Sequence, residues 1–156
     1  LSREIEKIVA YVGERETIKK EDLEKVAVAG EKWNVFQLVD LIAQKDTKKA
    51  LKTLEKILLG SDSPSSINFW ISEHFMGLLR TKSYPKKDWA GLVEYLGLEK
   101  RKVFLANKYS QQVSNFTLPQ LEKAIDLLYQ SELDLRSNLS TPKIILEVLI
   151  FNLSHL

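Results

Sequence analysis

The histidines and carboxylates of this chain are the side chains that could hold a metal or move a proton, and their spacing indicates neither role. The chain has two histidines, His74 and His155, and no cysteine. Neither histidine has a second histidine or a carboxylate at the spacing of a metal motif, and Glu73 beside His74 points elsewhere on a helix. Because a metal site needs three or more convergent ligands, we expect both histidines to be satisfied within the fold or exposed.

Motifs of nucleotide hydrolysis and of nucleophilic catalysis are missing from the sequence. The six glycines are scattered singly, without GxxxxGK[ST] or GxGxxG, and no serine lies in a GxSxG turn. Carboxylate pairs such as Asp126 with Glu132 lie among lysines, which favours solvated ion pairs over an acid and base pair. We therefore expect no catalytic residue, no metal and no cofactor, and a domain that binds other macromolecules.

One electrostatic pattern is more specific. Four lysines follow a spacing of four, three and four residues, at Lys45, Lys49, Lys52 and Lys56. If one helix continues through them, their ammonium groups lie within a sector of about 60°. This lysine stripe could track the phosphates of a nucleic acid, although a solvated helix face is the more common meaning of such a pattern. The net charge of +2 is too small to identify a polyanionic partner, so any basic surface must be local.

The elements that carry these residues are expected to be helices throughout. Apolar residues recur at intervals of three and four, and no segment alternates apolar and polar residues over the length of a strand. Two short helices are expected before residue 31, and longer ones over residues 33–44, 47–60, 64–84, 88–97, 100–113, 117–133 and 142–153. The predicted fold class is all-α, a multi-helix bundle. The longest apolar run, residues 144–151, contains Glu147 and is too short to cross a bilayer, so we expect no membrane partner.

The terminal helix has apolar residues in nearly every direction around its axis. Such a helix must be buried on more than one side. The pattern leaves two alternatives open: a central helix of this domain, or a helix covered partly by its own core and partly by another subunit. In the second case Ile145, Leu149 and Phe151 are the candidate subunit contacts.

The order and separation of several apolar and polar residues agree with a known family. The agreement is found in three segments: the run VFQLVDLIAQKD at residues 35–46, then Gly60 and Pro64 after a second apolar stretch, and the segment from Leu118 to Leu135. Together they resemble the delta subunit of the bacterial DNA polymerase III clamp loader. The resemblance covers most of the chain and depends mainly on hydrophobic spacing.

This resemblance implies a fold, a function and partners. Residues 1–31 look like the end of the small helical lid domain of an AAA+ related protein, and residues 32–156 look like a C-terminal collar domain. The implied function is a non-catalytic assembly domain, which holds the delta subunit in the loader pentamer that places the sliding clamp on primed DNA. The implied partners are ATPase subunits of the gamma/tau type and the delta-prime type through the collar, the sliding clamp through a region before Leu1, and primed DNA in the full complex. The implied location is the bacterial cytoplasm.

A candidate DNA contact also follows from the resemblance. Some family members have an aromatic residue that can stack near the template strand, in the loop before the last helix, and the matching position here looks like Leu139. Arg136, Asn138 and Lys143 near that loop could meet phosphates, as could the lysine stripe. The alternative function is therefore a stand-alone helical nucleic-acid-binding module that uses the lysine stripe.

Overall fold

The structure is a computed structural model that describes residues 34–156 of the chain. These residues form helices without a strand, which confirms the predicted all-α class. The two short helices expected before residue 31, and the lid remnant that they would form, lie outside the described residues. The elements are a helix over residues 34–43, α3 (Thr47–Leu58), α4 (Pro64–Ser83), α5 (Trp89–Tyr95), the 3-10 turn η1 (Lys100–Lys102), α6 (Phe104–Gln112), the 3-10 turn η2 (Val113–Asn115), α7 (Leu118–Ser137) and α8 (Pro142–Ser154).

Side-chain caps explain where three of the helices begin. Asp46 and Asp88 each accept a hydrogen bond from the backbone N–H three residues further on, at 3.2 and 2.8 Å. Thr117 forms a capping box with Gln120 at the start of α7. These side chains satisfy backbone donors that have no partner within the helix. The starts predicted at all three positions are confirmed.

The prediction of one helix over residues 100–113 is wrong, because the chain changes its winding twice in this segment. Lys102 N donates to Glu99 O at 2.7 Å, and Ala106 N donates to Val103 O at 3.0 Å. Hydrogen bonds over three residues wind the chain as a 3-10 helix, so η1 is distinct from α6. The segment contains no glycine or proline, and its local sequence therefore carries no stop signal.

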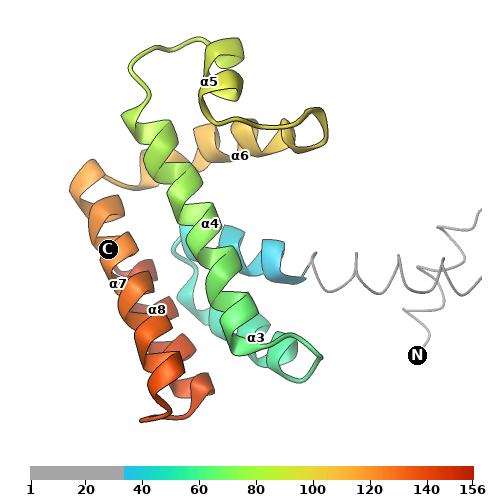
Figure 1. The fold of residues 1–156 in the computed structure, drawn as a ribbon, viewed down its shortest axis with the longest axis vertical. Coiled ribbons are helices and arrows are strands. Elements are labelled where there is room, and N and C mark those ends of the chain that lie inside the picture. The colour runs from blue at the N-terminus through green and yellow to red at the C-terminus, as the bar shows by residue number, and fades with distance from the viewer. Residues whose placement is uncertain (1–33) are drawn as a thin grey trace, which may run out of the picture.

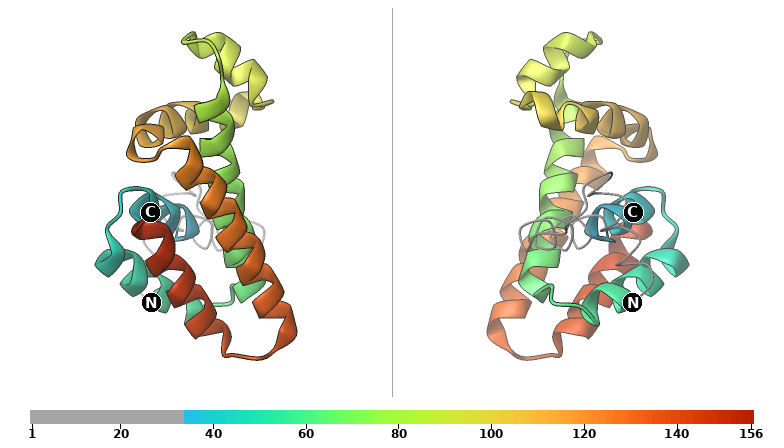
Figure 2. Two further views of the ribbon diagram at one scale, coloured as in Figure 1. Left: turned by 90° about the vertical axis from the view of Figure 1, so that its left-hand side faces the viewer. Right: turned by 90° about the vertical axis from the view of Figure 1, so that its right-hand side faces the viewer.

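The helices pack as two layers (Figures 1 and 2). The long helices α4 and α7 form one layer, and helix 34–43, α3 and α8 form the other. The α5, η1 and α6 segment lies at the C-terminal end of α4. Helix α4 is central, because it packs against α6, α7 and α8.

A single hydrophobic core fills the space between the layers. At its centre the rings of Phe75 and Phe116 lie 5.6 Å apart in an edge-to-face arrangement. Leu38 and Ile42 from helix 34–43, and Leu121 from α7, are also fully buried. The described part of the chain therefore buries a continuous core of its own.

Candidate functional site

Two of the three predicted subunit contacts belong to the core of this domain. Ile145 is 8% exposed and Leu149 is 3% exposed. Residues four apart lie on the same face of a helix, and this face of α8 points at the other helices. Ile145 and Leu149 therefore point into the domain, and the prediction that they contact another subunit is wrong. Phe151, the third candidate, is 51% exposed.

The opposite face of α8 carries an apolar stripe that the fold leaves uncovered. Ile144, Val148 and Phe151 follow a spacing of four and three residues, and each is about half exposed. The ring of His155 stacks on Phe151 at 4.1 Å and extends this surface. A contiguous exposed apolar stripe on a helix is typical of a protein contact. We call these three apolar residues the α8 stripe.

A second exposed apolar surface lies on the other layer. Phe69 on α4 and Tyr129 and Leu133 on α7 are 53%, 66% and 43% exposed. A shallow groove of about 350 Å³ runs between the two helices there, and Met76 and Glu132 contribute to its lining. Helices α4 and α7 form one layer and α8 belongs to the other, so this surface and the α8 stripe lie on different layers. Sequence reasoning missed this surface, although Phe69, between the core positions Ile67 and Ile71, could have signalled it.

The lysine stripe is shorter than predicted, because Lys45 does not belong to α3. Lys45 has a φ of 60°, and its N–H donates to Ile42 O while the N–H of Asp46 donates to Leu41 O. This is the Schellman pattern that ends a helix. The assumption that one helix continues through all four lysines is therefore wrong.

The side chain of Lys45 turns back onto the domain. Its Nζ donates to the backbone oxygen of Leu156 at 2.8 Å and lies 5.0 Å from the centre of the Phe116 ring. Lys49, Lys52 and Lys56 remain exposed on α3. Of these, Lys49 pairs with Asp46 at 3.2 Å. The backbone and side-chain hydrogen bonds from Lys49 hold the pKa of the Asp46 carboxyl below its usual value.

The four candidate residues around the turn from α7 to α8 lie at one end of the bundle, and two of them already have partners. Arg136 Nε donates to Glu132 at 2.9 Å. Lys143 lies within 3.9 Å of two carboxylates, on α3 and on α8. Asn138 ends α7 in the left-handed conformation, with a φ of 55°. Leu139 is 90% exposed but has no ring to stack on a base.

His74 is a core histidine, as the sequence predicted. Its Nε2 lies 2.6 Å from Gln112 Oε1, Gln112 Nε2 donates to Asp40 at 2.8 Å, and Lys108 Nζ pairs with the same carboxylate at 2.8 Å. This polar network ties helix 34–43 to α4 and α6. Burial lowers the pKa of His74 to about 4, because the loss of solvation outweighs the hydrogen bond to Gln112 and the charge of Asp40, which both raise it. Within residues 34–156, no group of three or more His, Asp or Glu side chains could hold a metal.

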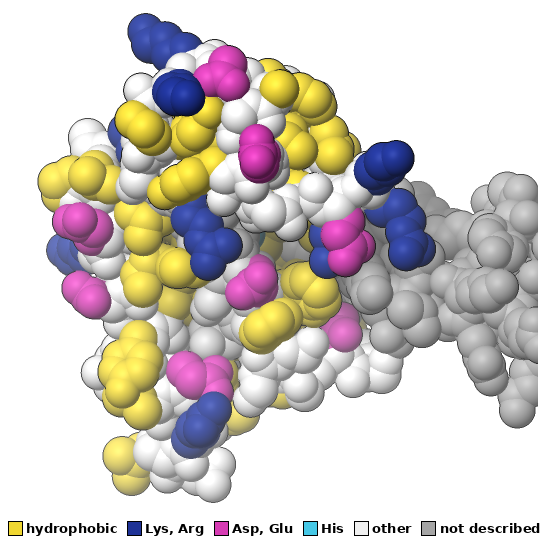
Figure 3. All heavy atoms as spheres, turned by 45° about the horizontal axis from the view of Figure 1, so that its top comes forward, with side chains coloured by type: hydrophobic (Ala, Val, Ile, Leu, Met, Phe, Trp, Pro, Cys, Tyr) yellow, Lys and Arg dark blue, Asp and Glu magenta, His cyan; other side chains and the backbone are white. Residues whose placement is uncertain are grey.

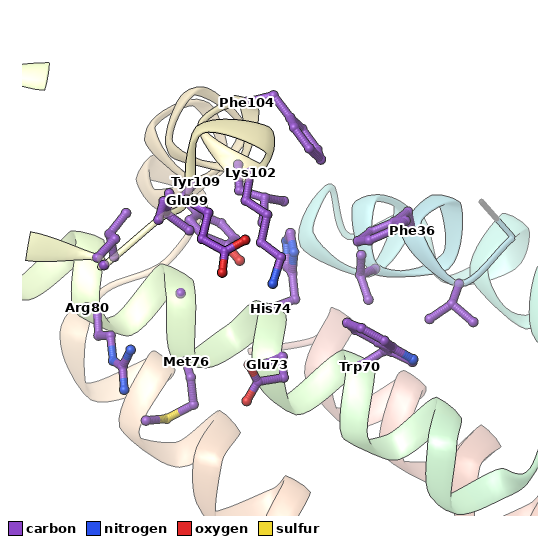
Figure 4. A pocket seen from close by; sticks show the side chains of 17 residues that line it. Phe36, Trp70, Glu73, His74, Met76, Arg80, Glu99, Lys102, Phe104 and Tyr109 are labelled. Atoms are coloured by element: carbon purple, nitrogen blue, oxygen red, sulfur yellow. The ribbon is translucent and has the colours of Figure 1, made fainter. Parts of the chain in front are cut away.

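A groove of about 370 Å³ lies between helix 34–43, α4 and the η1–α6 segment. Aromatic side chains from all three elements line it, namely Phe36, Trp70 and Phe104 (Figure 4). Charged side chains also line the groove, among them Lys102 in η1 and Glu99 just before η1. Sequence reasoning missed the groove, since its residues lie on elements far apart in the chain. We call it the aromatic groove.

Comparison with known proteins gives these surfaces a context. The family model described as DNA polymerase III delta subunit, C-terminal domain, matches residues 32–153. The chain is 27% identical to the probable DNA polymerase III subunit delta of Aquifex aeolicus (strain VF5), over 99% of this chain and 47% of that protein. It is 22% identical to the DNA polymerase III subunit delta of Bacillus subtilis (strain 168), over 97% of this chain and 43% of that protein. The chain thus spans less than half the length of these relatives.

A solved structure has the same fold. The Bacillus subtilis DNA clamp loader delta protein matches with a TM-score of 0.72 at 22% identity, over 99% of this chain and 45% of that one. No helix within residues 34–156 has the length and hydropathy needed to span a bilayer.

Proposed function

Since this chain belongs to the family of the C-terminal domain of the DNA polymerase III delta subunit, we propose that it is a non-catalytic assembly domain of a clamp loader. It holds the delta subunit in the loader pentamer, which places the sliding clamp on primed DNA during replication. The observation that carries this proposal is the α8 stripe, because Ile144, Val148 and Phe151 stay half exposed although residues 34–156 form a continuous core. A partner surface is the usual cover for such a stripe.

The two layers suit a place between two neighbours. One apolar surface lies on α8 and the other on α4 and α7, so one partner can pack on each layer without competing with the other. Subunits that contact neighbours through two different surfaces form rings or open arcs. We propose that an ATPase subunit of the gamma/tau type covers one of these surfaces and a subunit of the delta-prime type covers the other.

The proposal also covers the division of the chain into two parts and the binding of the sliding clamp and of DNA. Residues 1–31 form the end of a helical lid domain and residues 32–156 form the collar, which agrees with a family match that begins at residue 32. The sliding clamp binds a region of the delta subunit outside this chain, and primed DNA binds the complete loader in the cytoplasm. A stand-alone nucleic-acid-binding module that uses the lysine stripe has less support, because Lys45 is held by the backbone oxygen of Leu156.

Assembly with an ATPase subunit of the same organism tests the proposal. Size-exclusion chromatography with light scattering should show the parent chain in a complex with a gamma/tau-type and with a delta-prime-type subunit, and Val148→Asp should lose the complex whose partner covers the α8 stripe. A carboxylate buried without a partner costs about 3 kcal/mol, which weakens the complex by a factor of about 100. The matched control is Tyr95→Asp on α5, because Tyr95 is 50% exposed and Val148 is 53% exposed.

The control separates a specific contact from a general effect of added charge. Tyr95→Asp should leave the complex intact, although it loses the ring contact with Tyr84 and about 1 kcal/mol of stability with it. A parent chain that stays separate over a wide concentration range would contradict the proposal. So would equal weakening by the two variants.

A further inference from the structure

The aromatic groove has walls that suit a flat ring. Phe36 on helix 34–43 and Trp70 on α4 form one wall, with ring centres 6.0 Å apart and planes tilted by 54°. Phe104, at the start of α6, is 53% exposed and points toward the space above Phe36 (Figure 4). Three helices therefore hold three aromatic side chains around one open space.

The size and the floor of the groove set what can enter. Its volume of about 370 Å³ accommodates one base with its sugar and leaves no room for a base pair. Glu73 and Glu99 contribute carboxylates to the lining, and a carboxylate can accept a hydrogen bond from the amino group of a base. His74 and Tyr109 lie at the buried side, where their rings pack at 5.2 Å and close the floor.

The segment that contains α5, η1 and the start of α6 is rich in positive charge. Residues 80–108 contain eight Lys and Arg against three Asp and Glu, a net charge of +5, whereas the whole chain carries +2. Three consecutive exposed cations form η1, namely Lys100, Arg101 and Lys102. The last of them is two residues before Phe104 in the sequence. Figure 3 shows this end of the molecule, where exposed apolar side chains lie among scattered Lys and Arg side chains and a smaller number of Asp and Glu. Lys108, whose ammonium group pairs with Asp40, lies 6.0 Å from the centre of the Phe36 ring.

We propose that the aromatic groove binds single-stranded nucleic acid, with one base between Phe104 and the Phe36–Trp70 wall and adjoining phosphates on Lys100, Arg101 and Lys102. Aromatic platforms combined with a basic track are how proteins bind single strands without reading sequence. A base within a duplex is stacked on both faces, so only an unpaired base can enter the groove. This site differs from the lysine stripe and from the turn after α7, and it does not depend on subunit assembly.

Fluorescence anisotropy of a labelled oligothymidylate of about 16 nucleotides tests the proposal, with the complete 156-residue chain at about 50 mM salt. The parent should bind the single strand and prefer it to a duplex of equal length. Phe104→Ala should weaken binding about 5-fold or more, because one stacking contact is lost, while the dependence on salt stays the same. Phe104→Leu, which keeps an apolar side chain, should show the same loss and excludes an effect of folding.

Charge reversal provides a matched pair of variants. K100E/R101E/K102E should weaken binding and lower its salt dependence, because the phosphate contacts are lost. K49E/K52E/K56E changes the net charge of the chain by the same amount on α3 and should retain most of the affinity. The proposal is overturned if the parent does not bind the strand, if both Phe104 variants bind like the parent, or if the α3 variant loses more affinity than the η1 variant. The last result would assign binding to the lysine stripe.

Discussion

The buried histidine makes the stability of this domain depend on pH in a defined direction. The pKa of His74 falls from 6.5 to about 4 on folding, mainly because burial disfavours the charged ring. As the pH falls, the unfolded chain therefore binds a proton at this site before the folded one does. The contribution of His74 to stability is complete above about pH 6.5 and is lost progressively toward pH 4.

The size of the effect follows from the two pKa values. Each unit of difference corresponds to about 1.4 kcal/mol, so the full loss, reached below pH 4, is about 3 kcal/mol. At pH 5 the unfolded chain is largely protonated at this position and the folded protein largely is not. The free energy of unfolding should therefore drop by about 2 kcal/mol between pH 7.5 and pH 5 through His74 alone.

Urea unfolding followed by circular dichroism at these two pH values measures the drop. His74→Gln should remove it, because glutamine does not titrate, even if the replacement lowers stability at both pH values through the loss of the bond to Gln112. The reasoning is refuted if the parent is equally stable at both pH values, or if His74→Gln keeps the same dependence.

Two further predictions concern backbone positions. Gly77→Ala should destabilise the protein by about 1 kcal/mol, because the new Cβ would overlap the buried Tyr109 ring, although alanine has the better helix propensity. In a Tyr109→Ala background the ring is gone and Gly77→Ala should stabilise the protein. A destabilisation in that background would contradict the overlap. Asn138 has a φ of 55°, so Asn138→Ala should cost about 1 kcal/mol and Asn138→Gly should cost nothing. Equal stability of the Ala and Gly variants in urea unfolding would show that the left-handed conformation is not maintained.

The sequence predicted most of the helix starts, because these depend on residues close together in the chain. Asp46, Asp88 and Thr117 each bond to an N–H three residues away, so composition and order at the terminus suffice. The same holds for the absence of catalytic motifs, which are local patterns. The family resemblance also followed from the order of residues, and the comparisons confirm it.

The left-handed conformation of Lys45 and the break between η1 and α6 were beyond the local signal. Lys45 adopts a left-handed conformation that glycine usually occupies, and its side chain contacts Leu156 and Phe116, which are distant in sequence. The break between η1 and α6 has no marker residue either. In residues 100–113 the local pattern allowed a continuous helix, and the structure divides it.

The functional surfaces depended even more on tertiary structure. The terminal helix is apolar on all sides, so its sequence could not show that Ile145 faces the core while Val148 faces out. The aromatic groove combines Phe36, Trp70 and Phe104 from elements that meet only in the folded chain. Residue order alone thus determined the helices, their caps and the family, because neighbours along the chain set these features. The exposed faces and the groove were decided by which helices pack together, since burial is a property of the whole fold.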